Sequence, residues 1–217
     1  MGYKAVDKEF EELIVIQKSK FITTLVPISS QEDAQEKLNK IKKKYSDATH
    51  NCYAYISSEN AIEQRFSDDG EPQGTAGVPI LEVLKKKGVY MTLCVVTRYF
   101  GGIKLGANGL VSAYSSCAAS AIDKAQIVEY KISNGIDVDI EYSIYKKVQE
   151  AIEANDGQIE NIEYNESVKL QAIIPIENYE KAEKEIVDIT SGQAKITIKN
   201  TKYNKFIEAK NENHINN

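Results

Sequence analysis

Two glycine-rich loops contain most of the residues that could bind a ligand or carry out chemistry. One spans residues 68–77 and the other residues 99–109, and a predicted helix follows each. A helix start can hold a phosphate or a carboxylate, because its free N–H groups and its dipole favour negative charge. The residues that we expect to bind an anion there are Gly74, Thr75, Gly77, Arg98, Gly101, Gly102, Lys104, Gly106 and Asn108.

A second interpretation of these glycines is structural, because glycine also supplies positive φ angles and lets a helix pack closely on a sheet. Neither loop has the Gly-x-x-x-x-Gly-Lys-Ser/Thr or the Gly-x-Gly-x-x-Gly pattern. The sequence therefore predicts neither a nucleotide-hydrolase loop nor a dinucleotide-binding fold. The anion site and the structural turn both stay open as interpretations.

The first loop also carries three acidic side chains, Asp68, Asp69 and Glu71. They could ligate a metal ion or act as a general base. The favoured interpretation is structural, because Asp and Gly build tight turns and acidic groups stabilise the positive end of the following helix. No pair of Cys or His residues has metal-ligand spacing, so we predict no metal site.

A predicted strand over residues 49–57 carries the remaining candidates. His50, Tyr53 and Tyr55 could stack on unpaired bases. The two tyrosines fall on the face of the strand opposite His50. Such tyrosines more often pack under a helix or a loop. Cys52 and His50 share one face, but a Cys nucleophile needs an orienting third group that the sequence does not identify. We therefore predict no catalytic residue.

Composition limits the classes of function. The chain of 217 residues is 42% hydrophobic and 27% charged, which suits globular domains, and its net charge of −5 argues against generic nucleic-acid binding. No apolar run approaches the roughly 20 residues that cross a bilayer, and the first ten residues lack the apolar stretch of a signal peptide. We expect a cytoplasmic protein with reduced cysteines, no cofactor, no membrane contact and no DNA specificity.

The elements that must position the two loops form an α+β pattern. Two short apolar runs around a polar turn predict a β-hairpin near the start of the chain. Helical stripes and strand patterns then predict a helix over 30–45, strands over 49–57 and 62–66, a helix over 75–87, a buried strand over 89–97 and a helix over 110–124.

The rest of the chain predicts a second, smaller domain with the order βαββαβ, which is that of a ferredoxin-like unit. Its strands fall over 132–140, 159–164, 168–174 and 194–198, and its helices over 144–152 and 179–189. We divide the chain into an N-terminal domain, residues 1–127, a C-terminal domain, residues 128–201, and a flexible tail, residues 202–217.

Three motifs of the N-terminal domain closely resemble the YigZ/IMPACT family. They occur in the family's order and cover about residues 18–125. They read Ala-Thr-His-Asn-Cys-Tyr-Ala-Tyr over 48–55, Ser-Asp-Asp-Gly-Glu-Pro over 67–72 with Gly-Thr-Ala-Gly over 74–77, and Val-Val-Thr-Arg-Tyr-Phe-Gly-Gly-Ile-Lys-Leu-Gly over 95–106.

Two positions depart from the family pattern. Asn108 stands where a glycine is usual, and Ser112 stands where an arginine is usual. Asn tolerates positive φ, so we expect the shape of the second loop to be kept. The missing arginine removes one cation that could meet an anion.

The resemblance implies a first domain with the fold of a ribosomal small-subunit protein domain, which domain IV of elongation factor G shares. The second domain would be similar to domain V of that factor. Eukaryotic relatives act in translational control, so the resemblance implies a protein that faces RNA or the ribosome. Function inferred from a fold is analogy, and the family has no established catalytic residues to carry over.

The leading hypothesis is a non-enzymatic binding or regulatory protein linked to translation. It would contact RNA or a ribosome-associated protein through a groove between the two loops, where Lys104 and Arg98 would meet phosphates. One alternative is a phosphate- or nucleotide-dependent enzyme, because small-molecule kinases that share the expected fold use a Gly-rich loop at a helix start. A peptide-binding module that uses the same groove is the other alternative.

Overall fold

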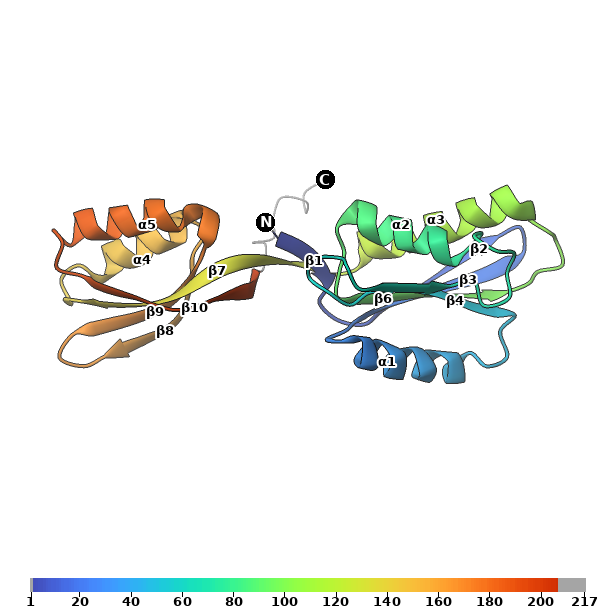
Figure 1. Ribbon diagram of the computed structural model, residues 1–217, viewed down its shortest axis with the longest axis horizontal. Coiled ribbons are helices and arrows are strands. Elements are labelled where there is room, and N and C mark those ends of the chain that lie inside the picture. The colour runs from blue at the N-terminus through green and yellow to red at the C-terminus, as the bar shows by residue number, and fades with distance from the viewer. Residues whose placement is uncertain (1, 207–217) are drawn as a thin grey trace, which may run out of the picture. The chain divides into compact units, whose positions relative to one another are not determined.

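The chain folds as a mixed α+β protein. The computed structural model describes residues 2–206, which contain five helices and two antiparallel sheets (Figure 1). Contacts between residues divide this part of the chain into an N-terminal unit, residues 3–129, and a C-terminal unit, residues 130–206 together with Gly2. Strand β7 (Ile127–Ile140) contains both this boundary and the predicted one after residue 127.

The N-terminal unit is built on a sheet with the strand order β2-β3-β6-β4-β5. Helix α1 covers one face of this sheet, and α2 and α3 cover the other (Figure 1). The elements are β2 (Phe10–Ile16), β3 (Ser19–Pro27), α1 (Gln31–Lys44), β4 (His50–Ile56), β5 (Gln64–Ser67), α2 (Gly77–Lys87), β6 (Thr92–Tyr99) and α3 (Gly106–Lys124).

Helix α1 forms where the apolar stripe and the N-cap serine of the sequence predict it. The Ser30 hydroxyl accepts a hydrogen bond from the Asp33 N–H at 3.2 Å, which satisfies one free donor of the first turn. The apolar stripe of the helix, Ala34, Leu38 and Ile41, is buried against the sheet. The helix therefore covers the face of the sheet that carries Tyr55.

Strand β6 occupies the centre of the sheet, and every residue in it except Tyr99 is buried. Burial on both faces explains the unbroken apolar run over residues 93–96. The strand begins three residues later than predicted. Gly88 ends α2 with a left-handed φ of 64°, and Met91 has a φ of 48°, so the chain turns between α2 and β6 before it extends.

Helix α3 begins at Gly106, four residues before its predicted start. Gly106 itself has a φ of 72°, and the residues after it are helical. Asn108 therefore lies in the first turn of the helix, and the positive φ that we expected there is wrong. The second loop is shorter than its glycine content suggested.

The C-terminal unit has the element order βαββαβ. It consists of β7, α4 (Tyr145–Ala154), β8 (Gln158–Tyr164), β9 (Val168–Pro175), α5 (Ile176–Ile189) and β10 (Lys195–Phe206). The sheet order is β1-β7-β9-β8, with β1 (Gly2–Val6) at one edge and β10 also paired to β7. One apolar core joins the sheet to α4 and α5, which lie on the same face (Figure 1).

Two further observations concern the C-terminal residues and the character of the helices. Residues 202–206, predicted as part of a tail, belong to β10, and residues 207–217 lie outside the described residues. None of the helices in residues 2–206 has the length and apolar character that a membrane span requires.

The turn between β2 and β3 explains one glycine of the second loop. Gln17 and Lys18 both have positive φ, 45° and 68°, and the strands pair from Ile16 opposite Ser19 onward, as in a tight hairpin. Gly101 packs directly on this turn, since a Cβ at Gly101 would lie 2.1 Å from the carbonyl carbon and oxygen of Lys18. Only glycine fits there.

We expect Gly101→Ala to lower the free energy of unfolding by about 3 kcal/mol or more, at the upper end of overpacking effects, because a backbone must move. Gly102→Ala is the matched control. A Cβ at Gly102 meets no atom within 4 Å, and only its φ of 86° is unfavourable, so a loss of about 1 kcal/mol is expected. Urea unfolding measures both losses. An equal or smaller loss for Gly101→Ala would contradict this account.

Candidate functional site

Asp68 in the first loop caps helix α2, although it lies several residues before the start of the helix. Its carboxylate accepts hydrogen bonds from the backbone N–H groups of Gly74 at 2.8 Å, Ala76 at 3.0 Å and Gly77 at 2.8 Å. These donors belong to the start of α2, whose N-cap residue Ala76 offers no side-chain oxygen. The protein's own carboxylate thus fills the anion position at this helix start.

The anion-binding role predicted for Gly74, Thr75 and Gly77 is corrected by this arrangement. The N–H groups of the two glycines already bond to Asp68. Thr75 is buried, and its hydroxyl donates to the carbonyl oxygen of Pro72 at 2.7 Å. A Cβ at Gly77 would lie within 2.9 Å of the Ser67 backbone, so close packing explains that glycine.

Asp69 links the first loop to β4 and α1. Its carboxylate accepts from the Asn51 N–H at 2.7 Å and from the Lys42 ammonium group at 2.7 Å. Burial raises the pKa of the Asp69 carboxyl, but these two hydrogen bonds outweigh burial and hold the pKa below its usual value. Its carbonyl oxygen lies 2.8 Å from His50 Nδ1. Within residues 2–206, no three acidic, Cys or His side chains are grouped as metal ligands.

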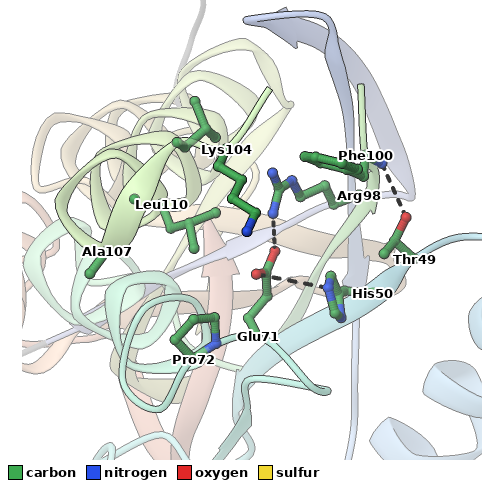
Figure 2. A pocket seen from close by; sticks show the side chains of 11 residues that line it. Thr49, His50, Glu71, Pro72, Arg98, Phe100, Lys104, Ala107 and Leu110 are labelled. Atoms are coloured by element: carbon green, nitrogen blue, oxygen red, sulfur yellow. Dashed lines mark hydrogen bonds and ion pairs between the residues drawn. The ribbon is translucent and has the colours of Figure 1, made fainter. Parts of the chain in front are cut away.

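Glu71 is the centre of a buried polar cluster (Figure 2). Its Oε1 accepts from Arg98 Nη1 at 2.6 Å and from the Tyr114 hydroxyl at 2.8 Å, and its Oε2 lies 3.8 Å from His50 Nε2. The side chains of Glu71 and Arg98 are only 3% and 6% exposed. Burial raises the pKa of the Tyr114 phenol far above its usual value, so this hydroxyl stays a donor.

The cluster forms one wall of a pocket with a volume of about 410 Å³. Residues of both glycine-rich loops line it, together with residues of β4, β6 and α3 (Figure 2). The lining residues are Thr49, His50, Glu71, Pro72, Arg98, Phe100, Lys104, Leu105, Gly106, Ala107 and Leu110. The pocket therefore has apolar side chains on several sides and a charged wall formed by Glu71 and Arg98.

The start of α3 differs from that of α2 because no side chain caps it. The N-cap residue Leu105 offers no hydrogen-bonding side chain, and the first-turn residues Gly106 and Ala107 line the pocket. Lys104 extends toward Glu71 in the middle of the pocket (Figure 2), and it has no ion-pair partner in the described part of the chain. Arg98 Nε is buried without a hydrogen-bond partner among these residues. This arrangement can hold an anion.

The predicted site residues of the second loop divide into two groups. Arg98, Lys104 and Gly106 line the pocket, as does His50 from β4. Gly101, Gly102 and Asn108 do not line it. Gly101 packs on the Lys18 backbone, and Gly102 supplies a φ of 86°.

The base-stacking role is corrected for the two tyrosines. Tyr53 and Tyr55 stack on each other, with ring centroids 6.2 Å apart, in the core that includes α1. Tyr55 is only 1% exposed and has no free ring face for a base. His50 lies on the opposite face of β4, so the three residues do not form one platform.

Sequence reasoning missed the apolar part of the site and one member of its buried cluster. Pro72, Phe100, Leu105 and Leu110 line the pocket, and Tyr114 bonds to Glu71 from beneath it. Phe100 carried a usable signal, because an aromatic residue between a buried strand and a Gly-Gly pair has little reason to be in a core. Tyr114 carried none, since nothing local indicates a partner 43 positions away.

Cys52 is not a nucleophile in this arrangement. Burial raises the pKa of its thiol to about 12, and its Sγ lies 2.9 Å from the Asp68 carbonyl oxygen and 3.4 Å from the Tyr114 hydroxyl. A thiol with such a pKa stays protonated near neutral pH. Cys94 and Cys117 are also buried and unpaired.

We expect Glu71→Gln to lower the free energy of unfolding by about 3–5 kcal/mol, because it leaves the Arg98 charge buried without its partner. The double variant Glu71→Gln/Arg98→Met removes both charges and should be more stable than Glu71→Gln alone. Urea unfolding of the two variants and of Arg98→Met measures this coupling. Losses that simply add would contradict the role of the ion pair.

Asp68 makes the stability depend on pH. Burial raises its carboxyl pKa, but the N–H donors of Gly74, Gly77 and Ala76 outweigh burial and leave the pKa below its usual value. The stabilisation is therefore complete above the pKa of unfolded Asp, about 3.9, and is lost as the pH falls through the lower folded-state value.

We expect Asp68→Asn to lower the free energy of unfolding by about 1–2 kcal/mol at neutral pH, as the loss of a helix cap does. The difference from the wild type should shrink below about pH 4, where the wild-type carboxyl also becomes neutral. Denaturation series at several pH values measure this difference. A difference that is the same in acid and at neutral pH would contradict the capping role.

Comparisons with known proteins agree with this architecture. The Impact N-terminal domain matches residues 17–122, and a domain of unknown function, DUF1949, matches residues 138–193. A crystal structure of a hypothetical protein has a TM-score of 0.57 and 28% identity, covering 92% of this chain and 98% of that chain.

Two bacterial relatives match nearly the whole chain. IMPACT family member YvyE of Bacillus subtilis is 39% identical and covers 90% of this chain and 90% of its own length. IMPACT family member YigZ of Escherichia coli is 32% identical and covers 83% of this chain and 90% of its own length. With both domains matched in order, this chain belongs to the IMPACT family.

Proposed function

We propose that this chain is a non-enzymatic binding or regulatory protein of the cytoplasm that is linked to translation. It contacts RNA or a ribosome-associated partner through the pocket between the two glycine-rich loops. Membership of the IMPACT family supports the link to translation, because the resemblance to that family implies a role in translational control. The fold alone does not decide the ligand.

The observation that carries the proposal is the unpaired cation at an uncapped helix start. Lys104 has no partner in the described part of the chain, and Gly106 and Ala107 of the uncapped first turn of α3 line the same pocket. Positive charge and free N–H donors at one point attract a phosphate or a carboxylate. Two other polar side chains of the pocket make structural hydrogen bonds: Glu71 accepts from Tyr114, and His50 bonds to the Asp69 carbonyl oxygen.

The proposal extends to the two domains. The C-terminal unit is ferredoxin-like, and the order β10-β7-β9-β8 of its own strands, with βαββαβ along the chain, supports this assignment. We further propose that the N-terminal unit has the fold of a ribosomal small-subunit protein domain and of domain IV of elongation factor G. The pairing of these two domain types supports a partner in the translation machinery.

A second candidate is a phosphate- or nucleotide-dependent enzyme. The pocket volume of about 410 Å³ favours it, because small-molecule sites typically have volumes of about 300–1,000 Å³. A thermal-shift series with nucleotides and magnesium tests this candidate. A nucleotide-dependent rise in the melting temperature that Lys104→Ala abolishes, with no RNA binding, would favour the enzyme.

Titration of a labelled RNA that has both a duplex stem and a single-stranded loop tests the binding proposal. We expect Lys104→Ala to weaken binding and to lower the slope of log affinity against log salt by about 0.7–0.9, the effect of one phosphate contact. Lys43→Ala is the matched control, since Lys43 is an exposed lysine of α1 outside the pocket. Binding without salt dependence, or equal affinities of the two variants, would contradict the proposal.

A further inference from the structure

Phe100 lines the pocket and is not part of a hydrophobic core of the described residues. The residue is 47% exposed and comes immediately after the central strand β6. The Arg98 guanidinium group lies 5.5 Å from the ring centroid and supports it from within. Exposed aromatic side chains beside cationic groups are the platforms on which proteins stack unpaired bases.

The rest of the pocket is suited to a ligand with a ring at one end and a negative charge at the other. Apolar side chains of Pro72, Leu105 and Leu110 enclose it, and Phe100 and Leu110 lie on different sides of it in Figure 2. Lys104 and the start of α3 supply the positive end. A flat ring and an anion must therefore be joined in one ligand to use all of these surfaces.

We propose that the pocket binds a single unpaired nucleotide, with its base on Phe100 and its phosphate at Lys104 and the start of α3. This inference rests on the proposed function and names the ligand of the same site. The pocket volume of about 410 Å³ is that of a site for one small molecule.

A base in a duplex is stacked between its neighbours and cannot reach a platform in a pocket, so the site selects single strands. The net charge of −5 supports local recognition, because a chain with this charge has no general attraction for a polyanion. A peptide carboxylate would meet the same cation. It would leave the exposed ring of Phe100 without a flat partner, so the nucleotide is the favoured ligand.

The test compares Phe100→Ala and Phe100→Leu with a matched control, Phe66→Ala. Phe66 is 48% exposed on β5 and does not line the pocket. Fluorescence anisotropy measures binding of a labelled single-stranded RNA and of a duplex of the same sequence. We expect both Phe100 variants to weaken single-strand binding by about 5- to 150-fold, the loss of one stacked base. Duplex binding should stay weak and unchanged, and the control should bind as the wild type does.

Phe100→Leu keeps an apolar side chain, so its loss of binding separates stacking from a change in fold. We also expect all three variants to unfold at midpoints close to that of the wild type. Equal single-strand affinities of Phe100→Ala and Phe66→Ala, while Lys104→Ala still weakens RNA binding, would overturn the nucleotide inference and leave the proposed function intact. No RNA binding by the wild type would overturn both.

Competition experiments identify the source of the nucleotide. We expect a nucleoside monophosphate to displace the labelled single strand from the wild type, whereas inorganic phosphate displaces it only at much higher concentration. Phe100→Ala should reduce this difference, because phosphate makes no use of the ring. Displacement by a peptide with an apolar C-terminal residue, but not by the nucleoside monophosphate, would also overturn the inference.

Discussion

The buried ion pair between Glu71 and Arg98 is the interaction on which the site depends. Arg98 belongs to the central strand β6, Glu71 to the first loop, and Tyr114, which also donates to Glu71, to α3. A buried carboxylate needs such partners, since an unpaired buried charge is strongly unfavourable. Together these three side chains join a loop, a strand and a helix, and the pocket forms where the three elements meet (Figure 2).

The two glycine-rich loops look alike in sequence, but the helix starts that follow them differ: a carboxylate caps the start of α2, and no side chain caps the start of α3. Asp68 turns back onto the start of α2 and occupies its N–H donors, so that helix start is closed to a ligand. No acidic residue lies within the second loop, and the start of α3 keeps its donors beside Lys104. One carboxylate, that of Asp68, therefore decides whether a helix start in these loops keeps its N–H donors free.

Much of the fold could be predicted because it depends on local periodicity. The stripe of Ala34, Leu38 and Ile41 is the buried face of α1, and the βαββαβ order follows from alternating apolar residues. The site could be predicted less well, because its contacts are long-range. Arg98 lies 27 positions from Glu71, and only the folded chain shows that α1 covers Tyr55. The early start of α3 was missed because tertiary packing overrode the poor helix propensity of its glycines.

Arg98 and Lys104, which looked equivalent as phosphate contacts, have different roles. Glu71 neutralises Arg98, and the guanidinium group lies 5.5 Å from the ring centroid of Phe21 and 5.5 Å from that of Phe100. Arg98 therefore shapes the pocket, while Lys104 and the helix amides supply its free positive potential. One unpaired cation in contact with water attracts an anion only weakly. In the proposed complex the apolar walls therefore supply much of the affinity, which is why we propose a ligand whose anion is attached to a ring.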